Sequence, residues 1–128
     1  MRHYSRGFTL IELLVVVAII GILSAVGVVS YSGYKTSAEK KQAEITLNSI
    51  YLAEQEYKSN NGEYYFNSST SNLVTNLFDG VDDLSEQSFT FKTTNTSTLT
   101  ITATKKANTS CTISITQTNK KPNVHSSC

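Results

Sequence analysis

The chain has 128 residues, a hydrophobic share of 39% and a formal net charge of +1. This length allows one domain. No nucleophile beside a base, phosphate-binding loop or cluster of metal ligands stands out, which argues against an enzyme and predicts no cofactor and no metal.

An apolar run begins at Phe8 and ends at Val29. Its 22 residues are enough for a helix to cross a bilayer. A single carboxylate, Glu12, interrupts it, and an acid within lipid costs roughly 2.5 to 3.5 kcal/mol on insertion scales. That cost calls for a partner that neutralises Glu12, which membrane anchoring alone does not supply.

An ordinary secretory signal or a simple membrane anchor is the alternative interpretation of this run. Arg2 and Arg6 form a basic region before it, and Ser24-Ala25-Val26 offers a small-residue cleavage neighbourhood. Two features argue against a signal peptide. The run is longer than the apolar core of a signal peptide, and such a core does not require an acid such as Glu12.

The segment Gly7-Phe8-Thr9-Leu10-Ile11-Glu12 follows a short basic leader. It resembles the processing motif of type IV pilins, most closely type IVa pilins, and of the related pseudopilins of type II secretion and competence systems. The resemblance covers residues 1 to about 57 and is weaker beyond. It implies that a prepilin peptidase removes residues 1–7 by cutting between Gly7 and Phe8. It also implies that Phe8 is then N-methylated and that Glu12 guides subunit assembly.

Electrostatics supports this role for Glu12. Cleavage leaves a cationic amine on Phe8 at the positive end of a helix dipole, where an anion is favoured. A low dielectric strengthens the pairing of this amine with the Glu12 carboxylate. The pair fits within one chain, because positions i and i+4 share a helix face, and equally between staggered neighbours.

The sequence predicts one helix from about Phe8 to Tyr57. Residues 34–57 contain no proline and carry one apolar stripe at helical spacing. The stripe consists of Ala43, Leu47, Ile50 and Tyr57, with Glu54 at its edge. We expect residues 8–33 to be the transmembrane and filament-core half of the helix. Residues 34–128 then form a soluble head that includes the second half.

One position of the helix departs from the pilin pattern. Pilins often carry a proline about 21 residues after the cleavage point, whereas this chain has Val29 there and its only proline is Pro122. The kink usually linked to that proline therefore lacks its usual cause. Gly21, Gly27 and Gly33 still weaken helix propensity, by about 1 kcal/mol each relative to Ala.

Beyond the helix, the segment Lys58-Ser59-Asn60-Asn61-Gly62 predicts a helix end, because Asn and Gly suit left-handed backbone conformations. A polar stretch then continues through Asn72. A short helical or irregular piece is expected around Leu73, Val74, Leu77 and Phe78.

The C-terminal third alternates with period two and predicts three strands. Their apolar positions are Phe89 and Phe91, then Leu99, Ile101 and Ala103, then Cys111, Ile113 and Ile115, with turns at Asn95 and at Lys106-Ala107-Asn108. Packed on the apolar stripe of the helix, these strands complete an α+β fold. The pilin resemblance implies the same fold, a long N-terminal helix on a small antiparallel sheet with a C-terminal disulfide loop.

Two cysteines, Cys111 and Cys128, follow the membrane run. If the basic leader stays inside, the head lies in the periplasm or outside the cell, where disulfides persist. A disulfide that closes a loop of this size would stabilise the folded head by about 3 kcal/mol, because it restricts the unfolded chain. Two unrelated free thiols are the alternative. The pilin resemblance favours the disulfide.

Acidic and basic residues separate along the second half of the chain. Acids gather at Asp79, Asp82, Asp83 and Glu86, whereas residues 87–128 hold no acid and five lysines, Lys92, Lys105, Lys106, Lys120 and Lys121. We favour a solvated basic face, or one that meets an acidic face of the next subunit, over a patch that binds DNA phosphates. For DNA the candidates are Lys105, Lys106, Lys120 and Lys121. The Cys111 to Cys128 tail loosely resembles that of pilins used in DNA uptake.

Metal binding has weak support. Asp79, Asp82 and Asp83 lack EF-hand spacing, so a helix cap or a solvated acidic turn is favoured over the calcium that some pseudopilins bind. His3 would leave with the leader, and His125 has no second ligand in sight.

The sequence-based prediction is a type IV pilin-like structural subunit that is processed, methylated and polymerised into an envelope-spanning filament for adhesion, twitching motility or DNA uptake. A type II secretion or competence pseudopilin is one alternative, and a DNA-binding minor pilin for transformation is an alternative of another class. The implied partners are other pilin subunits, a prepilin peptidase, the inner-membrane assembly platform, membrane lipid before assembly, and DNA. The implied location is the inner membrane, then a surface pilus or a periplasmic pseudopilus.

Overall fold

The computed structural model describes residues 7–81, 84–95 and 98–128. Arg2, His3 and Arg6 of the expected leader, and Asp82 and Asp83 of the acidic segment, lie outside these ranges. The chain divides into two compact units, Met1–Ser37 and Ala38–Cys128, and each is described separately below.

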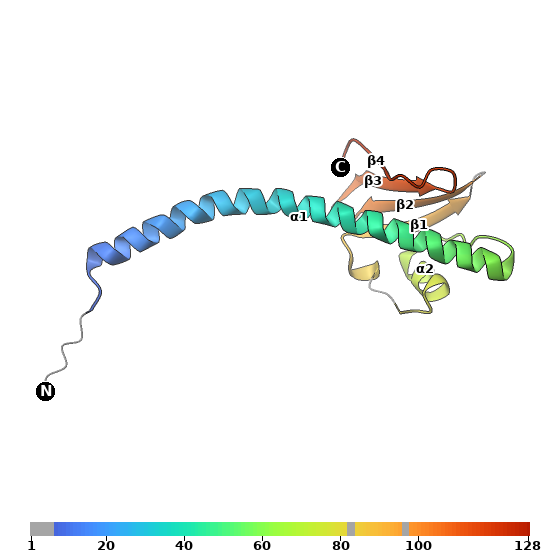
Figure 1. The fold of residues 1–128 in the computed structure, drawn as a ribbon, viewed down its shortest axis with the longest axis horizontal. Coiled ribbons are helices and arrows are strands. Elements are labelled where there is room, and N and C mark those ends of the chain that lie inside the picture. The colour runs from blue at the N-terminus through green and yellow to red at the C-terminus, as the bar shows by residue number, and fades with distance from the viewer. Residues whose placement is uncertain (1–6, 82–83, 96–97) are drawn as a thin grey trace, which may run out of the picture. The chain divides into compact units, whose positions relative to one another are not determined.

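A single helix of 52 residues, α1 (Leu10–Asn61), runs from the first unit into the second (Figure 1). It passes Val29 without a break and ends four residues beyond the predicted end at Tyr57. Gly62 ends it, with φ of +86° and an N–H that donates to the Lys58 carbonyl at 2.8 Å. The helix therefore ends at Gly62, because glycine adopts the left-handed conformation without steric cost. The polar residues just before Gly62 remain helical.

In the first unit, the apolar side chains of α1 are exposed all around the helix. An 18-residue window has a mean hydropathy of 2.8, and none of it is buried among the described residues. By length and composition α1 is the one helix in the described part of the chain that could cross a membrane. A helix that is apolar on every side needs lipid or protein around it.

The second unit combines the C-terminal part of α1 with two short helical pieces and an antiparallel sheet in the order β1-β2-β3-β4 (Figure 1). The short pieces are α2 (Thr70–Leu77) and the 3-10 helix η1 (Leu84–Glu86). The strands are β1 (Phe89–Asn95), β2 (Leu99–Lys105), β3 (Asn108–Thr116) and β4 (Asn123–Val124).

Strand register places the predicted apolar positions side by side on one face of the sheet. Phe91 pairs with Ala103, which pairs with Ile113, and Ile101 pairs with Ile115. Because side chains alternate between the faces of a strand, these residues all point toward α1, and the intervening Thr residues take the other face.

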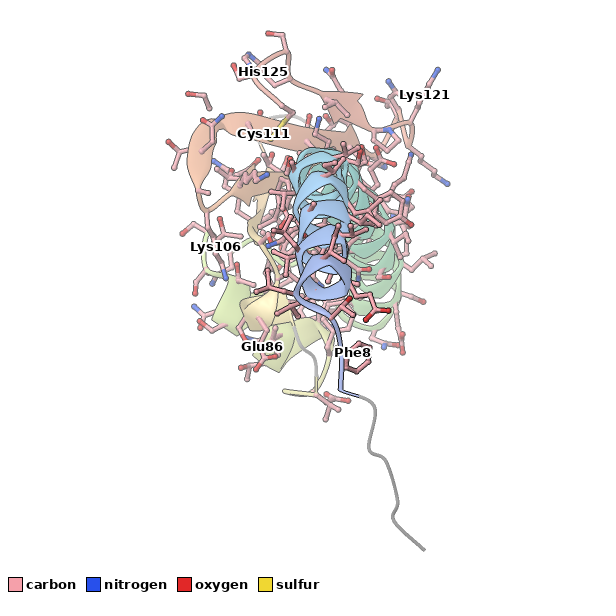
Figure 2. All side chains as sticks on the ribbon, turned by 90° about the vertical axis from the view of Figure 1, so that its left-hand side faces the viewer. Phe8, Glu86, Lys106, Cys111, Lys121 and His125 are labelled. Carbon is pink, nitrogen blue, oxygen red and sulfur yellow. A yellow bond between two sulfur atoms is a disulfide. The ribbon has the colours of Figure 1, made fainter. Side chains whose placement is uncertain are left out.

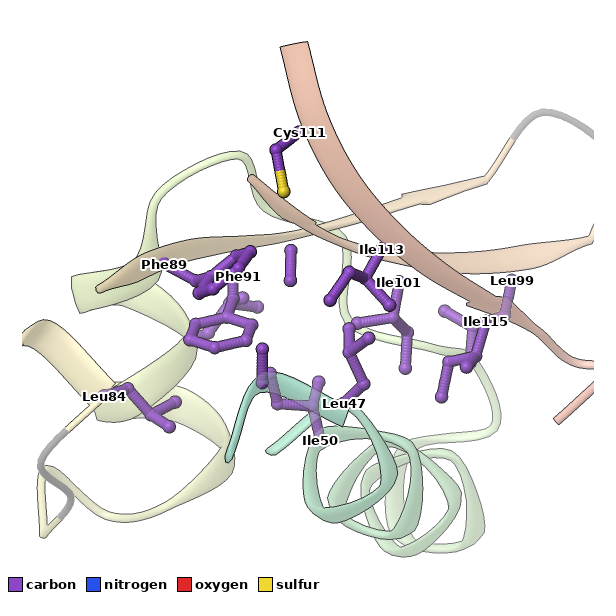
Figure 3. Close-up of a cluster of buried hydrophobic side chains, with 13 residues drawn as sticks. Leu47, Ile50, Leu84, Phe89, Phe91, Leu99, Ile101, Cys111, Ile113 and Ile115 are labelled. Atoms are coloured by element: carbon purple, nitrogen blue, oxygen red, sulfur yellow. The ribbon is translucent and has the colours of Figure 1, made fainter. Parts of the chain in front are cut away.

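The core lies between this face and α1. Figure 3 shows Leu47 and Ile50 of α1 directed at the aromatic and branched side chains of β1, β2 and β3. All eight predicted strand positions are buried, as are Ala43, Leu47 and Ile50 of the helix stripe. The predicted α+β arrangement is confirmed.

Two positions of the predicted helix stripe differ from the expectation. Glu54, expected at the edge of the stripe, is 0% exposed, whereas Tyr57 is only half-buried. The segment after Gly62 folds back over α1 at this level, which covers Glu54, and no helical periodicity encodes that coverage.

Local boundaries also differ. Asn95, expected in a turn, is the last residue of β1 and pairs with Leu99. Helix α2 begins at Thr70, inside the predicted polar stretch, and buries Leu73. The sequence does not predict strand β4, because two residues are too few to show an alternating pattern. This strand pairs with β3, where Val124 lies opposite Ile113.

The disulfide between Cys111 and Cys128 is present, with an S–S distance of 2.07 Å. The free-thiol alternative is therefore wrong. The bond ties β3 to the segment that follows β4, and Cys128 packs against the core.

Candidate functional site: the N-terminal motif and the lysines of the head

The bond between Gly7 and Phe8 lies in open, non-helical chain before α1. Within the part of the chain that the structure describes, no atom beyond its chain neighbours comes within 4 Å of the place where a Gly7 side chain would begin. The Phe8 side chain is 94% exposed and projects from the chain just before the helix (Figure 2). This geometry leaves the predicted cleavage bond accessible.

Glu12 and Thr9 form a reciprocal cap on the first turn of α1. The Thr9 N–H donates to Glu12 Oε2 at 2.8 Å, and the Glu12 N–H donates to Thr9 Oγ1 at 3.3 Å. This arrangement is a capping box, which satisfies two backbone donors that a helix start leaves free. The Glu12 carboxylate thus lies beside the residue that follows Phe8.

Sequence reasoning missed the role of Thr9. The signal was available, because Thr9-Leu10-Ile11-Glu12 has the S/T-x-x-E spacing of a capping box directly before an apolar run. The motif that predicts processing therefore also specifies where the helix begins.

The first pair of candidate lysines is occupied by contacts within the head. Lys105 Nζ lies 3.1 Å from Glu39 Oε2, and the two side chains are 18% and 21% exposed. Lys106 Nζ donates to the Ser85 carbonyl at 2.7 Å. Both contacts fasten the β2–β3 turn to neighbouring elements of the head.

The second pair lies in the loop between β3 and β4. Lys120 Nζ is 4.9 Å from the centre of the Tyr51 ring, a cation–π contact with α1. The ammonium of Lys121 has no ion pair or hydrogen bond to the described residues, and its side chain points outward (Figure 2).

The two lysine pairs lie at opposite ends of β3, and Lys105 and Lys120 contact residues of α1 that are about 18 Å apart along the helix at the usual rise per residue. Figure 2 accordingly shows Lys106 and Lys121 on different sides of the head. The structure does not bring the four lysines into one patch.

The remaining candidates stand apart from one another. Asp79 and Glu86 are exposed, and Asp79 has a positive φ of 51°. His125 Nδ1 is 3.1 Å from Ser127 Oγ. Among residues 7–81, 84–95 and 98–128, no group of three or more His, Cys, Asp or Glu could hold a metal ion.

The N-terminal part of the chain is similar to known proteins. Residues 2–28 match the family described as "Prokaryotic N-terminal methylation motif". The fimbrial protein of Neisseria meningitidis serogroup B is 37% identical over 75 residues, which cover 59% of this chain and 44% of that protein.

Two further relatives carry pilin names. The type IV major pilin protein PilE of Neisseria gonorrhoeae is 45% identical over 67 residues, covering 52% of this chain and 36% of that protein. The type IV major pilin protein PilA of Myxococcus xanthus is 38% identical over 60 residues, covering 47% of this chain and 27% of that protein.

The chain spans less than half the length of these relatives. No solved structure matches it. With an N-terminal methylation motif, similarity to major pilins over its N-terminal part and a long helix packed on an antiparallel sheet, the chain resembles type IV pilins.

Proposed function

We propose that the chain is a structural subunit of a type IV pilus, cleaved between Gly7 and Phe8, methylated at Phe8 and polymerised with other pilin subunits. One observation carries the proposal. An accessible processing motif leads directly into an apolar run, residues 8–29, that contains a single acid, Glu12, and the most apolar window of this helix is unburied among the described residues. Such a helix is suited first to lipid and then to a bundle of like helices.

Glu12 guides assembly in this proposal through its charge. Before cleavage the carboxylate caps α1 through the Thr9 N–H. Cleavage creates an amine on Phe8, the residue before Thr9, and an unpaired carboxylate in an apolar environment is costly. Pairing with an amine, from the same chain or from a neighbour, offsets that cost, and the pairing strengthens as water is excluded.

The division of labour along the chain is part of the proposal. Residues 1–7 are the leader that the peptidase removes, residues 8–33 are the transmembrane and filament-core helix, and residues 34–128 are the head. Before assembly, the subunit is anchored in the inner membrane with its head in the periplasm. It then enters a surface filament with the help of the assembly platform, and it acts as a structural protein without a cofactor.

Two findings support a pilus over a type II secretion pseudopilus. The relatives are named fimbrial protein and type IV major pilin, and the head carries the disulfide that pseudopilins usually lack. For the lysines, the contacts of Lys105, Lys106 and Lys120 within the head support a structural or subunit-contact role over DNA capture.

Filament incorporation tests the proposal. The full-length gene is expressed in a piliated bacterium that retains its peptidase and platform but lacks its own major pilin. We expect the subunit in sheared filaments that sediment at high speed and bind an antibody to the head. Subunits that are processed yet stay entirely in the membrane fraction would contradict polymerisation.

A further inference from the structure

Glu54 is the one buried charged residue in the described part of the chain, at 0% exposure. Its Oε2 accepts a hydrogen bond from the Tyr65 N–H at 2.8 Å, whereas its Oε1 is buried and has no hydrogen-bond partner among the described residues. A carboxylate at this place would carry a full charge out of water with a single donor to stabilise it. Burial of that kind favours the neutral acid.

The Tyr65 N–H belongs to a short segment that α1 and β1 hold between them. We call this segment, residues 62–69, the strap. On its other side the Thr93 hydroxyl of β1 donates to the Tyr65 carbonyl at 2.9 Å and accepts from the Asn67 N–H at 2.9 Å. The Thr93 N–H in turn donates to the Asn67 carbonyl at 2.9 Å. Glu54 supplies the hydrogen bond from α1 to the strap backbone at Tyr65.

No cation balances Glu54 from its own helix. Tyr51, Tyr57 and Lys58 lie within about one turn of it along α1. The Lys58 ammonium instead sits 4.4 Å from the centre of the Tyr64 ring. Among the described residues no ion pair includes Glu54.

The other elements packed around Glu54 contribute no opposite charge either. The strap faces it with Tyr64 and Tyr65, and the Tyr65 ring is 5.5 Å from the Tyr57 ring. Strand β1, which holds the strap from its other side, contributes Thr93, which does not titrate. Lys120, from the β3–β4 loop, engages the Tyr51 ring.

Burial raises the pKa of Glu54 from 4.5 to about 7, against the opposing effect of the Tyr65 hydrogen bond. An opened strap exposes Glu54 to water, where the ordinary value returns. The closed strap therefore binds the proton more tightly than the open one. The resulting stabilisation is fully present below pH 4.5 and is lost as the pH rises through about 7.

We propose that Glu54 is a proton-controlled latch, which as a neutral acid fastens the strap to α1 and as a carboxylate loosens it. The device changes how firmly one surface segment is held while leaving the sheet in place. The exposed side chain of Phe66, in the middle of the strap, moves with it.

Amide hydrogen exchange of the full chain in detergent micelles tests the latch. Exchange of strap peptides is compared at pH 5.5 and pH 8.5 after correction for the intrinsic pH dependence of amide exchange. With folded and open pKa values of about 7 and 4.5, linkage predicts that strap opening increases about 30-fold over this range. A peptide from β2 serves as the internal reference and should keep its protection.

Two variants sharpen the experiment. Glu54→Gln keeps an acceptor for the Tyr65 N–H and cannot ionise, so its strap should show the same protection at both pH values. Glu56→Gln removes an exposed acid two residues away and should retain the wild-type response. Equal strap protection in the wild type at both pH values, or a pH response that persists in Glu54→Gln, would overturn the latch. If Glu54→Gln does not fold, the wild-type protein alone tests the latch. Equal loss of protection in the strap and in β2 at pH 8.5 would mean that the head unfolds globally, and this result would also overturn the latch.

Discussion

The carboxylate of Glu12 accepts a hydrogen bond from the Thr9 N–H, and the Thr9 hydroxyl accepts one in return from Glu12. The same side chain is therefore a helix cap before processing and, in our proposal, an ion-pair partner afterwards. The two roles can be separated, because the cap needs both residues whereas the ion pair needs only the carboxylate.

Glu12→Val should leave processing intact and abolish filaments. Valine lowers the free energy of the segment in lipid but removes the charge that attracts a neighbour's amine. Subunits should therefore accumulate in the membrane. The measurement is the ratio of sheared to membrane-bound subunit.

Thr9→Ala is the matched control for this experiment. It removes the capping hydroxyl at a cost of about 1 kcal/mol to the helix start but keeps the carboxylate, so filaments should still form. If Glu12→Val assembles normally, or if Thr9→Ala fails as completely as Glu12→Val does, the ion-pair role is wrong.

Strand β3 connects several parts of the head. It pairs with β2 and β4, supplies Ile113 and Ile115 to the core, and is bonded through Cys111 to Cys128. The disulfide closes a loop with a sequence separation of 17 that includes β4, which has only two residues. A strand this short has little stability of its own, so the bond should hold that edge of the sheet.

Replacing both cysteines by serine should lower the free energy of unfolding of the head by about 3 kcal/mol, mainly because the unfolded chain gains freedom. Urea unfolding of the full chain in detergent, followed by tyrosine fluorescence, measures the change. The reduced wild-type protein is the control and should show a similar loss. A loss below about 0.5 kcal/mol in both would mean that the loop does not restrict the unfolded chain.

The elements differ in how far the sequence predicts them, for physical reasons. The strands around Phe91, Ile101 and Ile113 were predicted because a sheet with one buried face alternates apolar and polar residues. The burial of Glu54 was not, since it depends on a strap that carries no periodic pattern. Strand β4 is too short for any period to show.

The residues of the candidate site also differ in how far the sequence predicts them. Gly7, Phe8 and Glu12 form a local motif, so their identification needs no tertiary information. The contacts of Lys105 with Glu39 and of Lys106 with Ser85 join residues far apart in sequence. A count of lysines along the chain shows a basic segment, but only the fold shows that these charges are already engaged.

At the scale of the whole molecule, the net charge of +1 and the separation of the lysine pairs argue against a field strong enough to capture DNA. We therefore expect the oxidised, full-length protein in neutral detergent to show no measurable binding to duplex DNA at low salt. Fluorescence titration at two salt concentrations measures this.

The opposite result has a specific signature. Binding that weakens steeply with salt, with a slope that flattens by about 0.9 for each lysine replaced by Gln among Lys105, Lys106, Lys120 and Lys121, would establish phosphate contacts and contradict our interpretation. Lys92→Gln, on the outer face of β1, provides the control for a general loss of positive charge.

If this chain is processed as a pilin and built into a filament, the N-terminus of the filament subunit records both steps and is their most direct test. Mass spectrometry of sheared filaments should identify a subunit that begins at Phe8 with one added methyl group on its amine and with the Cys111–Cys128 bond intact. Gly7→Leu should yield only uncleaved, membrane-held protein, because a bulky side chain blocks the approach of the peptidase to the backbone, whereas Gly21→Leu, within α1, should be cleaved normally. A mature protein that begins near Ala25, as a secretory signal would produce, or normal cleavage of Gly7→Leu, would contradict the account.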